Sequence, residues 1–308
     1  MWEIGIGSAI VLLHIIVFYY IRNFEPQLVD GYGDSFSWTL LFRSIFFILG
    51  FVSIAAGLWG LYQSKHLSLD DIIPTQEAVE FIGQTEFLTP YYSYALVGAI
   101  VLVGVVQVVV GLDESFTRAA FVKQDFIGKA EYWRILTGAT LHGSFLHLYL
   151  NGQALYGIGA STERVSNRAH LSIVFLLAVL GGGLCSFVFM RNGLPSVGTS
   201  GGIMGLIGYL AVFGQRRKHQ LPPGFSKNLL VGIALTALMG VIGFQFIDNF
   251  AHLGGLIVGA VYAFIQIPSD KYADPRRVSN FVQIAGLVSL GIYLATCVFS
   301  ILLIMRTV

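Results

Sequence analysis

Two short motifs place residues with complementary chemistry at the starts of two apolar segments. Ser200 belongs to the sequence GTSG that begins at Gly198, and His252 belongs to the sequence AHLGG that begins at Ala251. A serine hydroxyl becomes a nucleophile when a base removes its proton, and histidine has a pKa suited to accepting and returning that proton. The two motifs together therefore predict a Ser-His pair that hydrolyses an acyl bond.

Glycines mark the helix faces that would bring this pair together. At about 100° per residue, glycines form a stripe beside Ser200 and share the face of His252. They are Gly201, Gly205 and Gly208 on the first segment, and Gly255 and Gly259 on the second. Such stripes let two helix backbones approach closely. We therefore expect the two helices to pack together, with the hydroxyl and the imidazole in hydrogen-bond contact.

Donors for the oxyanion of a tetrahedral intermediate are expected from a third segment. His147 and Asn151 are four residues apart, so they share one helix face, and both side chains can donate N–H groups. The backbone N–H groups of Ser200 and Gly201, unpaired at a helix start, would add to this oxyanion hole. The histidines, with His142, could instead bind a metal. No cysteine or second i,i+4 histidine pair supports that, so we predict no metal and no cofactor.

Each of these residues also has a purely structural interpretation. A serine in a glycine-rich membrane helix is usually a packing residue, and a lone intramembrane histidine is as often a satisfied polar contact as a functional group. The sequence around Ser200 also matches G-x-S-x-G, the nucleophile elbow of soluble α/β-hydrolases. That motif needs a preceding strand, whereas here a loop follows an apolar helix, so the match is accidental. The remaining histidines show no pattern that suggests a site; they are His14, His66, His170 and His219.

The composition is that of a protein embedded in lipid. Of 308 residues, 55% are hydrophobic and 11% are charged, against about 25% charged in soluble domains. So few charges cannot cover a water-exposed surface. A net charge of +1 argues against a nucleic-acid partner, and Cys185 and Cys297 lie in apolar runs, where each is expected to fill core space. The expected partners are the bilayer and transmembrane protein substrates, and the sequence leaves the oligomeric state open.

Nine apolar segments are long enough, or nearly long enough, to span a bilayer as helices. They cover residues 4–21, 39–62, 92–112, 143–162, 170–190, 200–214, 228–246, 250–267 and 280–305. The sequence therefore predicts an all-α, polytopic transmembrane helical bundle. We divide it into an N-terminal two-helix hairpin (1–64), a cytoplasmic linker (65–91), a six-helix core (92–267) and an extra C-terminal helix (278–308).

Basic residues in the loops set the expected orientation. With the N-terminus inside, ten Lys and Arg residues lie on the cytoplasmic side and seven on the outer side, and the densest basic cluster, at 216–218, is cytoplasmic. Ser200 and His252 then both begin helices at the outer face, at similar depth. The segment 113–142 mixes aromatic residues with charges and is too polar to span, so we expect it to lie partly in the outer interface.

Five motifs, in order, resemble those of the rhomboid family of intramembrane serine proteases, over roughly residues 92–267. They are Trp133-Arg134 in a long first loop, His142 with His147 and Asn151 in the second core helix, Glu163-Arg164 at the end of that helix, Gly198 to Gly205 around Ser200, and Ala251 to Gly259 around His252. One position departs from the family. An aromatic residue is common four positions after the serine, where this chain has Met204.

The resemblance implies a six-helix protease core and a role for each matching residue. Ser200 would be the nucleophile and His252 the general base and then acid, with His147 and Asn151 stabilising the oxyanion. Supporting roles are implied for His142, Trp133, Arg134, Glu163, Gly198, Gly201, Gly205, Gly255 and Gly259. The implied reaction is cleavage of transmembrane segments of other membrane proteins near the outer face, through an acyl-enzyme. We expect a bacterial inner or plasma membrane, with the N-terminus in the cytoplasm.

Two other functions are compatible with such a bundle. A non-proteolytic rhomboid-like protein that binds membrane clients would usually lack the serine or the histidine, and this chain has both. A transporter would place ionisable residues at mid-depth in several spans, and apart from Arg43 the sequence has almost none. The three helices outside the core could restrict substrate entry or bind a partner, and the sequence favours neither.

Overall fold

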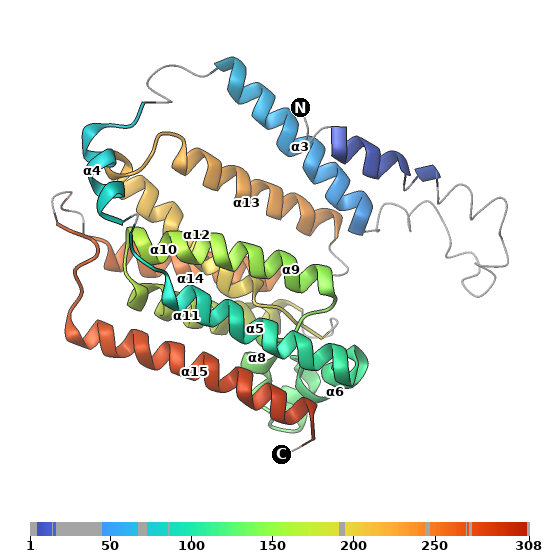
Figure 1. The fold of residues 1–308 in the computed structure, drawn as a ribbon. Coiled ribbons are helices and arrows are strands. Elements are labelled where there is room, and N and C mark those ends of the chain that lie inside the picture. The colour runs from blue at the N-terminus through green and yellow to red at the C-terminus, as the bar shows by residue number, and fades with distance from the viewer. Residues whose placement is uncertain are drawn as a thin grey trace. The chain divides into compact units, whose positions relative to one another are not determined.

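The chain folds almost entirely into helices (Figure 1). The computed structural model describes residues 5–13, 15–16, 45–66, 73–85, 87–190, 195–243, 247–268, 270 and 273–306. Within these ranges the only β-structure is an isolated antiparallel bridge between Phe121 and Ser196. Five helices are long and apolar enough to cross a membrane, judged by length and composition. The predicted all-α polytopic bundle is confirmed.

The long helices follow the predicted apolar segments to within a few residues. They are α3 (Ile45–His66), α5 (Tyr91–Val110), α11 (Arg168–Phe189), α12 (Ser200–Arg216), α13 (Phe225–Ile242), α14 (Asn249–Gln266) and α15 (Asn280–Ile304). Of the first predicted span, residues 5–13 and 15–16 are helical, and 4, 14 and 17–21 lie outside the described residues. Residues 39–44 of the second span, with Arg43, also lie outside them.

The predicted span 143–162 is a helix made of three pieces. α9 (Phe145–Ala154) passes into a π-helical turn, η5 (Leu155–Gly159), and then into α10 (Ala160–Val165). Single π-helical turns inside α-helices are rare and are frequently found at functional sites. The apolar pattern alone does not reveal the interruption, because it changes the local hydrogen bonding without changing the overall hydropathy.

Short helices occupy the segments that were expected to be loops or linkers. They are α4 (Gln76–Thr85) in the linker, α6 (Leu112–Ala119), α7 (Lys123–Gly128), α8 (Arg134–Thr137) and the 3-10 turn η4 (Gly138–Thr140) in the first loop, and the 3-10 turn η6 (Lys218–Gln220) after α12. The predicted linker therefore contains a helix. Ala78 and Phe81 on α4 are buried, and the guanidinium of Arg276 lies 4.9 Å from the ring centre of Phe81.

Capping side chains fix the starts of three helices around the site. Ser144 accepts a hydrogen bond from the backbone N–H of His147 at the start of α9, and Asn167 accepts one from Ala169 at the start of α11. Ser279 caps α15 in the same way. Each cap pairs a backbone donor that a helix start would otherwise leave without a partner. The start of α9, and with it the position of His147, is thus set locally.

Contacts divide the chain into two compact units. One comprises Met1–Ile73 and Leu230–Asn249, and the other comprises Pro74–Leu229 and Phe250–Val308. All the predicted site residues belong to the second unit. The predicted domain boundaries at 64, 91, 267 and 278 remain predictions.

α11 is the central helix of the second unit. It packs against α12 and α15, and also against α5 and α8. Its buried residues run along nearly its whole length, from Ala169 to Ser186. A helix that is apolar on most faces is expected at the centre of a membrane bundle. α11 thus forms the support against which the serine-bearing helix α12 is held.

Candidate active site

Ser200 and His252 are in direct contact. Ser200 is the first residue of α12, and His252 lies in the first turn of α14. The imidazole Nε2 is 2.7 Å from the serine Oγ, although the two residues are 52 positions apart in the chain. Both side chains are half-buried. The distance is that of a good hydrogen bond between a nucleophile and its base.

The glycines between α12 and α14 explain how the two side chains meet. A methyl group added to Gly255 would lie 2.0 Å from the carbonyl oxygen of Gly201, and one added to Gly259 would lie 1.8 Å from that of Gly205. These distances are far below van der Waals contact. Any side chain at Gly255 or Gly259 would therefore force the helices apart.

Gly205 also packs against α11, where a methyl group would lie 2.1 Å from the Cβ of Ala178. Small residues thus bring α12 close to both of its neighbours. The serine is held from two sides by backbone contacts, which leave little freedom for α12 to shift.

Gly198 shapes the turn that leads into Ser200. Its φ angle of 119° is one that residues with a side chain rarely adopt. A methyl group there would lie 3.0 Å from Nε2 of His147 and 3.8 Å from Oγ of Ser200. Glycine at this position therefore permits the turn and lets the backbone approach the ring of His147.

His147 has a tautomer that its neighbours define. The backbone N–H of Gly143 donates to Nδ1 of His147 at 3.3 Å, so Nδ1 is an acceptor. In a neutral imidazole the hydrogen must then be on Nε2. That nitrogen faces the turn at Gly198, next to Ser200. His147 can therefore present an N–H donor on the serine side of the ring.

Asn151 lies one helical turn further along α9. Its side-chain Nδ2 donates to the backbone oxygen of His147 at 3.0 Å, and the residue is buried. An amide carries two N–H donors, and this bond uses one of them. Asn151 thus fixes the local geometry around His147 and has a second donor for another acceptor.

His142 lies in the segment just before α9, and both of its backbone groups bind the side chain of Gln107. The N–H of His142 donates to Oε1 at 2.9 Å, and Nε2 of Gln107 donates to the carbonyl oxygen of His142 at 3.2 Å. The ring centres of His142 and His147 are 5.2 Å apart. Nε2 of His142 lies 3.4 Å from Oγ1 of Thr199. Burial lowers the pKa of His142 to about 3, and the neighbouring His147 acts in the same direction. The imidazole is therefore neutral.

Trp133 and Arg134 are placed in the first loop and do not contact the serine or the histidine of the pair. The Arg134 guanidinium donates to the carbonyl oxygens of Ala120 and Thr117 at 2.8 and 3.1 Å. It also pairs with Glu131 and packs on the ring of Trp133. A guanidinium has five donors in a fixed plane, so this one buried residue ties several turns of the loop together.

Glu163 of α10 is likewise placed away from the Ser-His pair, and its side chain contacts the start of α5. Its carboxylate accepts hydrogen bonds from the backbone N–H groups of Tyr92 and Ser93 at 3.2 and 3.0 Å, and from the Ser93 hydroxyl at 2.9 Å. A negative charge at a helix N-terminus is favourable because the unpaired N–H groups there carry partial positive charge. Glu163 thus joins the end of α10 to the start of α5.

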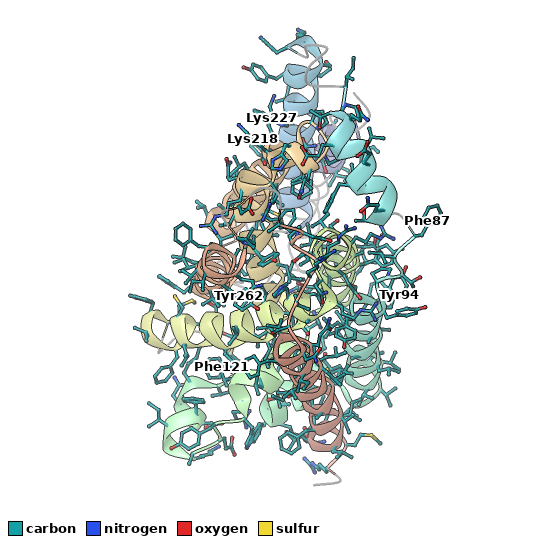
Figure 2. The ribbon with its side chains drawn as sticks, turned by 90° about the vertical axis from the view of Figure 1, so that its left-hand side faces the viewer. Phe87, Tyr94, Phe121, Lys218, Lys227 and Tyr262 are labelled. Atoms are coloured by element: carbon teal, nitrogen blue, oxygen red, sulfur yellow. The ribbon has the colours of Figure 1, made fainter. Side chains whose placement is uncertain are left out.

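Two buried polar residues, Gln107 and His170, were given no role from the sequence. Gln107 is 1% exposed on α5, and His170 is 0% exposed on α11. His170 is bound by Tyr262 (labelled in Figure 2) through Nδ1 and by Gln266 through Nε2, each at 2.9 Å. The usable signal was a polar residue inside an apolar span, which requires a buried partner. The identity of that partner was not readable from the sequence.

Comparison with known proteins identifies the family of this chain. The family model of the rhomboid domain matches residues 129–269. The chain is 32% identical to the rhomboid protease GlpG of Haemophilus influenzae over 149 residues, which are 47% of this chain and 73% of GlpG. The chain belongs to the rhomboid family.

Two further relatives show the range of that family. The chain is 30% identical over 212 residues, 66% of its length, to the rhomboid protease GluP of Bacillus subtilis, and it spans 40% of the length of GluP. It is also 31% identical over 128 residues to an Arabidopsis thaliana protein named as an inactive RHOMBOID-like protein, covering 41% of this chain and 36% of that one. The family thus unites membrane-embedded proteases with inactive members, and the chain's own residues must decide between these.

Proposed function

We propose that this chain is an intramembrane serine endopeptidase that uses Ser200 as nucleophile and His252 as base. The observation that carries the proposal is the 2.7 Å contact between the serine Oγ and Nε2 of His252. Inactive members would have no reason to keep the hydroxyl, the imidazole and the close glycine packing that joins them. The substrates we propose are transmembrane segments of other membrane proteins.

In the proposed reaction His252 accepts one proton and then gives it up, once during acylation of the serine and once during hydrolysis of the acyl-enzyme. Oγ of Ser200 attacks the peptide carbonyl carbon while Nε2 of His252 takes the hydroxyl proton. The tetrahedral intermediate collapses, the C–N bond breaks, and His252 returns the proton to the departing amine. Water then attacks the acyl carbon while His252 takes its proton. The ester C–O bond breaks as His252 gives that proton to Oγ of Ser200, which releases the acid and restores the serine.

The negative oxygen of the intermediate needs donors that are already in place. Nε2 of His147 is the first candidate, because its hydrogen faces the turn at Gly198. The second amide hydrogen of Asn151 and the backbone N–H groups of Ser200 and Gly201 at the start of α12 are the others. The buried His142 would hold this region in shape as a neutral ring.

The position of the pair favours cleavage near one membrane face. α12 is a short helix of 17 residues, which spans roughly 25 Å at about 1.5 Å per residue. Ser200 at its start therefore lies close to the membrane boundary, and the half-buried side chains admit water. We propose the outer face of a bacterial plasma membrane, with the N-terminus in the cytoplasm. A substrate helix must unwind to expose its carbonyls, so helix-breaking Gly or Pro near the cleavage site should favour cleavage.

The test compares a Ser200→Ala variant with the full-length wild type in lipid vesicles. We expect the wild type to cleave a transmembrane substrate and to react with a fluorophosphonate probe, and Ser200→Ala to do neither. The control is Ser161→Ala, because the Ser161 hydroxyl bonds only to Gly157 within its own helix, at 2.8 Å. Cleavage by Ser200→Ala would refute the assignment. A wild type that neither cleaves nor labels would instead favour a client-binding protein.

A further inference from the structure

The C-terminal helix α15 is an integral part of the second unit. It packs along α11 and α5 and also contacts α6, α8 and η4 of the first loop (Figure 1). It lies beyond residues 129–269, which match the rhomboid domain. The match to the rhomboid domain therefore says nothing about the role of α15, which must be inferred from its contacts.

Two buried hydroxyls of α15 reach the segment 138–142. The hydroxyl of Tyr293 donates to the carbonyl oxygen of Ala139 at 3.0 Å. The Thr140 hydroxyl shares its hydrogen between Oγ of Ser300 at 2.9 Å and the carbonyl oxygen of Thr137 at 2.8 Å, and the Ser300 hydroxyl donates to the carbonyl oxygen of Thr296 in α15 at 2.9 Å. Tyr293 is 1% exposed, and Ser300 and Thr140 are each 0% exposed. Hydrogen bonds in such surroundings are costly to break, because neither partner can turn to water.

The same segment holds the turn that carries the nucleophile. The backbone N–H of Gly198 donates to the carbonyl oxygen of Gly138 at 3.0 Å. At the other end, Nε2 of His142 lies 3.4 Å from Oγ1 of Thr199. Segment 138–142 therefore contacts the serine turn through its two ends, Gly138 and His142, and α15 through Ala139 and Thr140.

The segment also packs against the bridge between Phe121 and Ser196. A methyl group on Gly138 would lie 2.7 Å from the backbone nitrogen of Phe121, which forms the bridge with Ser196 (Phe121 is labelled in Figure 2). Gly138 is thus closely packed on that bridge. The segment therefore has little room to shift toward the bridge, and Ala139 and Thr140 are also bonded to α15.

α15 is itself attached to the first loop. Arg118 of α6 donates to the carbonyl oxygen of Ile304 in the last turn of α15, and Glu114 pairs with both Arg118 and Arg306. Hydrogen bonds from the two guanidinium groups hold the pKa of Glu114 below its usual value. Phe299 packs edge-on against Trp133 with ring centres 5.6 Å apart. These contacts fix α15 along its axis, and so fix the height of Tyr293 and Ser300.

From this chain of contacts we propose that Tyr293 and Ser300 are positioning residues for the nucleophile. They hold Ala139 and Thr140, which hold Gly138 and His142, which in turn hold the turn from Gly198 to Ser200. Misplacing a reacting group by about 1 Å can cost on the order of a hundredfold in rate. The C-terminal helix therefore acts in catalysis through the backbone of the serine turn. The inference rests on the proposed function, because it needs an active serine to be positioned.

The experiment removes the two hydroxyls and little else. Tyr293→Phe keeps the ring that packs edge-on against Phe175, with centres 4.9 Å apart, and Ser300→Ala removes one oxygen. The matched control is Thr296→Val, because the Thr296 hydroxyl is buried on the same helix but bonds only to Ile292 of α15, at 2.8 Å. All variants are full-length proteins in vesicles. The readouts are kcat and KM for a transmembrane substrate, the rate of fluorophosphonate labelling, and Tm.

We expect the double variant Tyr293→Phe, Ser300→Ala to lose about tenfold in kcat with KM unchanged, and to label more slowly by a similar factor. Thr296→Val should keep the wild-type values. A double variant that labels and cleaves at the wild-type rate would overturn the proposal. A rise in KM with kcat unchanged would do so as well, since α15 would then contact substrate. An equal loss in Thr296→Val would show a general effect of helix stability and would also contradict it.

The two proposals fail in different ways. If the proposed function is wrong, the wild type itself does not react with the probe. If only the role of α15 is wrong, the wild type labels, Ser200→Ala does not, and the Tyr293 and Ser300 variants match the wild type.

Discussion

α12 and α14 take part in two polar clusters that differ in how their hydrogen bonds are used. The first is the dyad cluster of Ser200, His252, His147 and Asn151. The second, the His170 network, consists of Ser166, His170, Tyr209, Tyr262 and Gln266. Both contain a histidine inside the bundle, so the residue type alone does not separate a reactive group from a structural one.

The His170 network is closed. Both ring nitrogens of His170 are bonded, to Tyr262 and Gln266, and the ring stacks on Tyr209 at 6.2 Å between centres. The Tyr209 hydroxyl is 2.6 Å from that of Ser166. Aromatic rings fill the surrounding space, and His170 is 0% exposed. Such a histidine has no site left to accept a proton from a substrate.

The dyad cluster differs from the His170 network in its neighbours and in its exposure. Glycines surround it where aromatic rings surround His170, and its serine and two nearest histidines are only half-buried. Close backbone packing fixes the groups while leaving open space and access to water. The comparison teaches that a histidine of a candidate active site differs from a structural one in what its neighbours leave available. His170 is fully buried and bonded through both ring nitrogens, whereas His252 and His147 are half-buried close to the serine.

The largest effect is expected at His252. If His252 is the base, replacing it with alanine should lower kcat by on the order of 10⁴-fold or more, as for the loss of the base in serine hydrolases. The protein should stay folded, since His252 is half-buried and the glycine packing remains. Cleavage assays measure kcat, and the Tm shows whether the variant is folded. A His252→Ala variant with near-normal kcat would end the distinction between the two clusters.

A smaller loss is expected for the oxyanion donors. Removing one such donor typically costs about 10² to 10³ in kcat. His147→Ala and Asn151→Ala should each fall in this range with KM little changed, because the donors act mainly on the transition state. Steady-state kinetics on purified variants tests this. If either variant changed only KM, that residue would belong to substrate binding.

Close helix packing is tested at Gly259. Gly259→Ala would place a methyl group 1.8 Å from the carbonyl oxygen of Gly205, so we expect about 1–3 kcal/mol of destabilisation and a clear loss of activity. The control is Gly98→Ala, because a methyl group on Gly98 would meet nothing within 4 Å. It should be neutral or slightly stabilising. Similar unfolding free energies for the two variants would contradict the account of the glycine faces.

The smallest effect on catalysis is expected in the His170 network. Tyr262→Phe leaves the buried Nδ1 of His170 unpaired, which should lower the free energy of unfolding by about 1–3 kcal/mol. The kcat of the folded protein should stay within a factor of about two, since no reacting group is touched. Tyr91→Phe, which removes an exposed hydroxyl, is the control. A large loss of kcat without loss of stability would show that the two clusters are coupled.

Much of the fold could be predicted because helix formation in lipid follows local rules. Each apolar segment must satisfy its backbone hydrogen bonds internally, and seven of the predicted segments form one long helix each, close to the predicted bounds where these are described. The π-helical turn within 145–165 and the helix α4 in the linker were not predicted. The π-helical turn changes the local hydrogen bonding and leaves the hydropathy unchanged, and α4 is short and makes contacts with distant residues, such as that of Phe81 with Arg276.

The candidate site was predictable in part for a related reason. The periodicity of Gly201, Gly205, Gly255 and Gly259 identified the faces that pack, and so the partners that meet. The role of Gln107 was not predictable. Its two hydrogen bonds join it to His142, which is 35 positions away, and no local pattern specifies that pairing.

The sequence by itself determined that this chain lies in a membrane, where its helices run, and which faces of α12 and α14 pack closely. These properties follow from hydropathy and helical period, which are local. Only the tertiary structure decided which histidine is bonded on both nitrogens, where Glu163 and Arg134 act, and that α15 reaches Ala139 and Thr140 from 154 and 160 positions away. Such pairings depend on the three-dimensional positions of whole helices, because a hydrogen bond requires atoms to meet within a few tenths of an ångström.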